Sequence, residues 1–175
     1  MTRYTALLRG INVGGINIKM ADLRNVFSEL GFTEVRTVLA SGNVLFEAAA
    51  SDTRQLKATI EHALSERFGY DAWVFVFELS VIREVVAAYP FDPDREGWHA
   101  YVVFVDGSEP LATLLEGAEN LDPASERVQL GDGVVYWEVE RGHTLSSRFG
   151  KASGKAKFKA VTTTRNIRTL QKLLK

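Results

Sequence analysis

The spacing of apolar residues along the first 78 positions predicts a regular succession of strands and helices. Apolar side chains between Met20 and Leu30 recur at helical spacing, and Gly31 follows them as a stop signal. Short runs rich in β-branched and aromatic residues predict strands. In chain order we expect a strand at 4–9, a helix at 20–30, strands at 35–40 and 43–47, a helix at 56–68 and a strand at 73–77.

Turn and cap signals separate these elements. The turn Ser41-Gly42 joins two predicted strands into a hairpin, because glycine accepts the positive φ that such a turn needs. Ser51 or Asp52 is expected to cap the second helix, and Gly69 to end it. The resulting order, βαββαβ, is typical of a ferredoxin-like unit, in which two helices cover one face of a four-stranded antiparallel sheet.

The second half of the chain predicts a similar but shorter order. We expect a helix at 81–88, a strand at 100–105, a helix at 110–116, strands at 128–130 and 134–139, and a last helix. This half is read as βαββα. The predicted fold class is therefore α+β, with two ferredoxin-like (α/β-plait) subdomains packed together. The first spans residues 1–78, and the second spans residues 79–175, including a basic C-terminal tail and helix.

The charge distribution is uneven, although the net charge is only -1 over 175 residues. Residues 142–175 contain nine Lys and Arg and no Asp or Glu, so this tail carries +9 and the remainder carries -10, from 12 bases and 22 acids. The asymmetry has two readings: the tail and the body attract each other, or the tail attracts an external anion.

Composition excludes several classes of site. The chain has no cysteine, so disulfides, thiolate metal ligands and thiol nucleophiles are absent. His62, His99 and His143 are scattered, and the spacing of metal-binding motifs is missing, so we expect neither a metal site nor a cofactor. The N-terminus lacks an apolar signal core, and no apolar run approaches the roughly 20 residues that cross a bilayer. We therefore expect a cytoplasmic protein that does not enter a membrane.

A loop rich in Gly and Asn follows the first predicted strand. Backbone N–H groups of such a loop can converge on one point and bind an anion. The glycines at 10, 14 and 15 fit neither a Walker A loop nor a GxGxxG turn. Alternatively, the glycines only permit a tight connection and the arginine pairs with an acid of the body. The candidate binding residues in this loop are Arg9, Asn12, Gly14, Gly15 and Asn17.

Two further segments carry candidate binding residues. Ser41 and Asn43 flank the hairpin turn, which composition alone explains as a turn. Near the C-terminus Thr164 is the expected cap of the last helix, whose N–H groups would suit a phosphate together with Thr163, Arg165 and Asn166. The alternative is a capped helix with solvated charges.

Basic and acidic side chains elsewhere have simpler readings. Bases alternate with aromatic residues upstream of the last helix, a mixture that can suit nucleic acid but is usually a solvated loop. The Pro-rich segment with Asp92, Asp94 and Glu96 is read as turn chemistry. The bases of the upstream segment are Arg148, Lys151, Lys155, Lys157 and Lys159, interrupted by Phe149 and Phe158.

Four sequence blocks together resemble a known family. The blocks are RGINVGGINIKMADLRNVFSELGF, VRTVLASGNVLF, AYPFD and TTTRNIRTLQKL. Their order resembles the bacterial family known as domain of unknown function 1697. The resemblance implies two α/β-plait subdomains and implies no established activity. Its matched polar positions are Arg9, Asn12, Gly14, Gly15, Asn17, Ser41, Gly42, Asn43, Thr163, Thr164, Arg165 and Asn166.

These observations favour binding of a phosphate-bearing anion, either a nucleotide or a nucleic acid. One alternative is an enzyme of unassigned chemistry, with Asn12, Ser41, Asn43 and Arg165 around a small polar substrate. Another is an interaction module that forms a homodimer through an open sheet face or edge. The sequence contains no evident catalytic base or nucleophile. It leaves open whether the loop after the first strand, the hairpin turn and the start of the last helix lie close together in space.

Overall fold

The computed structural model describes residues 1–12, 16–40 and 42–175. The protein has an α+β fold with two four-stranded antiparallel sheets. The chain forms two compact units, which are Met1–Arg83 with Lys172–Lys175, and Glu84–Gln171. We call these the first and the second unit. No helix in the described ranges is long and apolar enough to cross a membrane.

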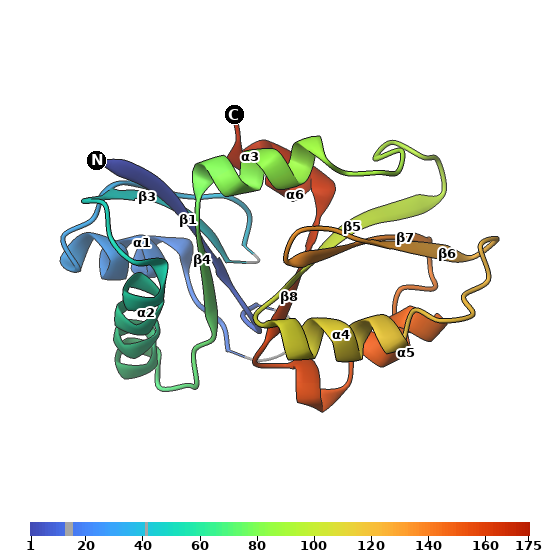
Figure 1. Ribbon diagram of the computed structural model, residues 1–175. Helices are drawn as coiled ribbons and strands as arrows, with labels where there is room; N and C mark the ends of the chain where they lie inside the picture. Colours follow the sequence, from blue (N-terminus) through green and yellow to red (C-terminus); the bar gives the residue numbers. More distant parts are fainter. Residues whose placement is uncertain (13–15, 41) are drawn as a thin grey trace. The chain divides into compact units, whose positions relative to one another are not determined.

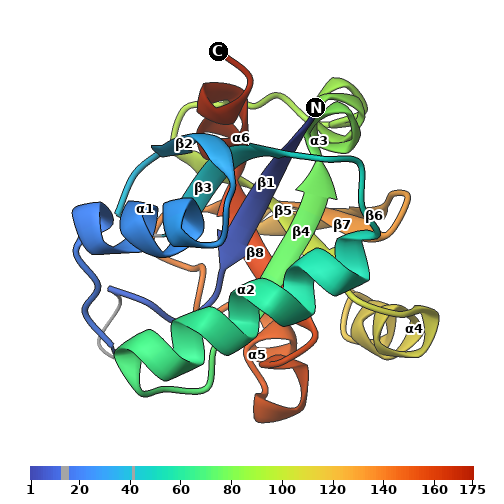
Figure 2. The same cartoon turned by 90° about the vertical axis from the view of Figure 1, so that its left-hand side faces the viewer.

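The first unit has the element order βαββαβ that the sequence predicts. Its strands follow the spatial order β2-β3-β1-β4, and α1 and α2 lie on one face of this sheet (Figure 1, Figure 2). The element bounds are β1 Thr2–Leu8, α1 Met20–Glu29, β2 Thr33–Thr37, β3 Asn43–Ala48, α2 Thr53–Phe68 and β4 Val74–Glu78, followed by α3 Leu79–Ala87.

Apolar residues from the strands and helices of the first unit are buried together in one core. Alternate residues of β1, such as Tyr4 and Leu8, are buried in one cluster with Phe27 of α1 and Ile60 of α2. In a strand every second side chain points to the same face, so these alternate residues form the face of the sheet that packs against α1 and α2. As expected, Asp52 caps α2, because its side chain accepts a hydrogen bond from the backbone N–H of Arg54 at 2.8 Å.

The second unit repeats the strand order of the first. Its sheet runs β6-β7-β5-β8, and α4 and α5 lie on one face (Figure 1). That face of the sheet is buried in a cluster that includes Val103, Trp137 and Phe149. The bounds are β5 Trp98–Val105, α4 Ser108–Glu116, β6 Glu126–Leu130, β7 Val134–Glu140, α5 Arg148–Ser153, η1 Ala156–Phe158, β8 Thr162–Asn166 and α6 Ile167–Leu173.

The predicted βαββα order of the second unit is wrong, because a fourth strand, β8, closes it as βαββαβ. β8 pairs antiparallel with β5, so that Thr164 lies opposite Val103. Threonine is β-branched and suits a half-buried strand, which the reading of this run as a helix start overlooked. The predicted cap, Thr164, is therefore also wrong. Instead, Asn166 Oδ1 accepts the backbone N–H of Arg168 at 2.9 Å in the first turn of α6.

Candidate functional site

The loop between β1 and α1 reverses the chain through two residues with positive φ. Gly10 has φ 73° and Asn12 has φ 56°, and Ile11 forms an isolated parallel bridge with Ile16. Asparagine tolerates this left-handed conformation better than most residues. Gly14 and Gly15, two of the predicted anion ligands, lie outside the described residues.

The side chain of Asn12 fixes this loop. Its Nδ2 donates to the carbonyl of Ile18 at 3.1 Å and to the carbonyl of Ala40 at 2.7 Å. Its Oδ1 accepts the N–H of Ile18 at 2.9 Å. Both amide protons and the carbonyl oxygen are thus engaged within the protein, so Asn12 positions the loop. The bond to Ala40 also shows that the loop meets the turn between β2 and β3.

Gly42 lies in that turn, and its lack of a side chain lets the turn pack against the end of β1 and the loop that follows it. Its φ is 89°, and its carbonyl accepts the N–H of Leu8 at 2.8 Å. A Cβ atom there would lie 2.9 Å from Leu8 Cβ and 2.9 Å from Ile11 Cδ1. Next to it, Asn43 is fully buried, and its Nδ2 donates to the carbonyl of Val38 at 2.8 Å. This bond gives Asn43 a structural role; Ser41 lies outside the described residues.

Arg9 is the charged group of the loop. Its backbone N–H donates to the carbonyl of Trp73 at 3.0 Å, while its side-chain Nε is buried without a hydrogen-bond acceptor among the described residues. Burial lowers the pKa of the Arg9 guanidinium below its ordinary value. A buried donor without an acceptor is unfavourable, so an anion at this position would offset the desolvation of the charge. Asn17, the remaining candidate here, is exposed.

The C-terminal candidates belong to the second unit and lie in β8, and of these only Asn166 caps the helix that follows. Thr163 is 1% exposed and Arg165 is 8% exposed, both within β8. Arg165 Nη1 donates to Thr163 Oγ1 at 2.8 Å and to the carbonyl of Thr164 at 3.0 Å. The helix N–H groups proposed as anion ligands therefore do not begin at Thr163 or Thr164. α6, which does follow, is a seven-residue helix capped by Asn166.

The sequence reading missed a charged cluster in the second unit. Glu138 of β7 is 1% exposed, and its Oε1 accepts from Arg95 Nη1 at 2.7 Å and from Arg127 Nε at 2.7 Å. The Arg95 guanidinium also lies 3.6 Å from the centre of the Trp98 ring. The pairing of Arg127 with Glu138 across β6 and β7 follows from the strand register, but Arg95 is 43 residues away from Glu138.

This cluster fastens the turn that precedes β5 to the sheet. Within the turn, Asp92 Oδ1 accepts the N–H of Asp94 at 2.9 Å, as the reading of these acids as turn residues implies. Tyr89 donates its hydroxyl to the carbonyl of Trp137 at 3.2 Å. Burial, and secondarily the charge of Glu138, raises the pKa of Tyr89 above its ordinary value. In the described part of the chain, no group of three His, Asp or Glu side chains is placed to hold a metal ion.

Comparisons with known proteins agree with this fold and identify no biochemical activity. A family model described as "Protein of unknown function (DUF1697)" matches residues 1–136, so the C-terminal block lies outside the matched range. No curated protein matches the chain significantly. The conserved bacterial protein SP0830 from Streptococcus pneumoniae is similar in structure, with a TM-score of 0.80 and 25% identity. The match covers 98% of this chain and 96% of that one.

A second structural match is too distant to carry an argument. It is an unknown protein from Galdieria sulphuraria, with a TM-score of 0.29 and 12% identity, covering 94% of this chain and 96% of that chain.

Proposed function

We propose that this chain, which belongs to the DUF1697 family, binds a phosphate-bearing anion through Arg9 and the loop at residues 9–18. The observation that carries the proposal is the buried Nε of Arg9, which has no acceptor among the described residues. A guanidinium presents several donors in a fixed plane and suits the oxygens of a phosphate. The ligand class is a nucleotide or a short nucleic acid.

The loop around Arg9 supports this proposal because hydrogen bonds within the protein preorganise it. Asn12 ties the loop to Ile18 at its far end and to Ala40 in the turn between β2 and β3, so these described parts would lose little conformational entropy when a ligand binds. The chain also carries an acid-free segment of +9 at residues 142–175, a charge that attracts anions.

We also propose that both units are ferredoxin-like (α/β-plait) units. The support is their common element order, βαββαβ, and their matching strand orders, β2-β3-β1-β4 and β6-β7-β5-β8.

The test is a calorimetric titration of the purified protein with ATP and with a short single-stranded DNA at low salt. Arg9→Gln removes the cation but keeps a polar side chain, and we expect it to weaken binding roughly 10- to 100-fold, the effect of one charge-assisted hydrogen bond. Arg54→Gln is the matched control, because Arg54 is exposed in the first turn of α2. Equal affinities of the two variants, or no binding by the wild type, would contradict the proposal.

A further inference from the structure

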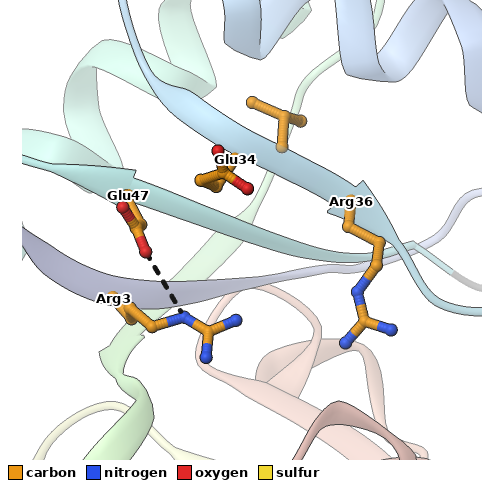
Figure 3. Close-up of a pocket in the computed structure, with 5 residues that line it drawn as sticks. Arg3, Glu34, Arg36 and Glu47 are labelled. Atoms are coloured by element: carbon orange, nitrogen blue, oxygen red, sulfur yellow. Dashed lines mark ion pairs between the residues drawn. The ribbon is translucent and has the colours of Figure 1, made fainter. Parts of the chain in front are cut away.

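A groove on the sheet of the first unit is not explained by the anion site. It has a volume of about 680 Å³ and opens onto solvent over β1, β2 and β3 (Figure 3). It shares none of its residues with the loop at residues 9–18. Four of its five lining side chains are charged, and both signs are present equally: the lining residues are Arg3, Glu34, Val35, Arg36 and Glu47.

A β-bulge in β2 creates this arrangement. Thr33 pairs with Glu47 and Arg36 pairs with Leu45, so two residues of β2, Glu34 and Val35, lie between pairs where a regular strand has one. Residues paired across strands share a face, and the extra residue therefore turns Arg36 to the face of Glu47. In a regular strand Val35 would occupy that position; here it packs against the core of the unit instead.

The backbone conformation of Glu34 shows that the bulge is strained. Glu34 has φ 50°, a left-handed conformation that is uncommon for residues other than glycine and asparagine. Glycine would adopt this φ without strain, yet the position holds a carboxylate that is exposed and faces the groove. The bulge therefore places a charged side chain where backbone preference alone would favour glycine.

The charges in the groove are only loosely paired. Arg3 and Glu47 lie 3.7 Å apart, with their side chains 56% and 27% exposed. Arg36 Nη2 makes one long hydrogen bond, 3.4 Å, to the carbonyl of Lys175. Within the described ranges neither Arg36 nor Glu34 has an ion-pair partner. Arg36 and Glu34 therefore retain most of their capacity to bind a ligand, and the long, partly exposed pair of Arg3 and Glu47 retains part of it.

We propose that this groove binds a small zwitterion, such as a free amino acid or a dipeptide. A simple anion would be attracted by the two arginines and repelled by the two glutamates. A simple cation would be attracted by the glutamates and repelled by the arginines. A dipolar ligand satisfies both signs, with its ammonium group on the carboxylates and its carboxylate on Arg36. The opposite charges of the ligand and the groove fix its orientation.

The experiment is an NMR titration of the ¹⁵N-labelled full chain with a panel of free amino acids and dipeptides. We expect at least one of them to shift the amides of residues 33–37 and 45–47. Its N-acetyl form and its methyl ester should each bind about fivefold more weakly, as expected for loss of one exposed ion pair. The absence of shifts at about 10 mM, above the range of weak but specific dissociation constants, would overturn the proposal.

Two variants separate binding from folding. Glu34→Gly relieves the left-handed strain, so it should keep or raise stability while it weakens binding about fivefold. Arg36→Gln should weaken binding by a similar factor, and Arg54→Gln should leave it unchanged. If the capped ligands bind as well as the free ones, or if both groove variants retain wild-type affinity, the groove is not a zwitterion site. ATP binding by Arg9 is a separate property, and Glu34→Gly should not alter it.

Discussion

At the scale of single residues, Asn12 decides the geometry of the loop after β1. Asn12→Ala removes three hydrogen bonds and leaves the carbonyl of Ala40 without this donor. We expect the free energy of unfolding to fall by about 2 kcal/mol, the combined effect of partly exposed bonds that water can replace in part. Urea unfolding measures this change. Asn17→Ala, at an exposed position of the same loop, is the control and should change stability by less than about 0.5 kcal/mol.

If Asn12→Ala unfolds at the same urea concentration as the wild type, the loop is not held by this side chain. The anion affinity of Asn12→Ala should also fall, because its loop must then be ordered on binding. An unchanged affinity would show that Arg9 acts without a preformed loop.

Glu138 has an equally specific role in the second unit. Glu138→Ala would leave the Arg95 and Arg127 guanidinium groups without their shared carboxylate. Breaking a fully buried pair typically costs about 3–5 kcal/mol, but here the arginine side chains are 38% and 48% exposed, so we expect about 2 kcal/mol. Thermal and urea unfolding measure the loss. Glu140→Ala, at an exposed position of the same strand, should have little effect; equal losses in the two variants would contradict this role.

At the scale of elements, we expect a histidine of β5 to make stability depend on pH. Burial, and secondarily the positive charge of Arg141, lowers the pKa of His99 below its ordinary value of 6.5. The unfolded chain therefore binds a proton more readily than the folded one as pH falls below about 6.5, and stability decreases there until the folded-state pKa is passed. His99→Gln should lose less stability than the wild type between pH 7.5 and pH 5.5 in urea unfolding. An identical loss would show that other groups cause the dependence.

The strength of each local pattern determined which elements could be predicted. The helices and strands of the first unit follow regular apolar periods with clear turn and stop signals, and their order was confirmed. β8 was missed because its polar threonines lack the alternation of a typical strand, and its pairing with β5 is a contact between distant segments. α5 and η1 were missed because their bases suggested a solvated tail, whereas Phe149 and Phe158 anchor them in the core.

The candidate sites depended on contacts that no local pattern contains. Arg9 and Asn12 stood out in the sequence, but the bond from Asn12 to Ala40 joins residues 28 positions apart. The groove at Glu34 was not predicted at all, since an extra residue in a strand is visible only once the register is known. For Asn43, composition gave no indication that its side chain is fully buried.

At the scale of the whole molecule, the chain uses one strand order in two units and concentrates positive charge near its C-terminus. If the ligand is an anion, its binding should weaken as salt rises, because salt screens the attraction between opposite charges. For a short DNA, the slope of log affinity against log salt counts the phosphates that are neutralised. This slope should decrease by about one when Arg9 is replaced by glutamine.

The measurement that tests the central claim most directly is the NMR signal of the Arg9 side-chain Nε–H during titration with ATP. In the free protein this group has no acceptor among the described residues. We expect its resonance to move downfield and its exchange with water to slow as the phosphate binds, and its assignment is checked by its disappearance in Arg9→Gln. A resonance that stays in place at saturating ATP would contradict the proposal that Arg9 is the anion ligand.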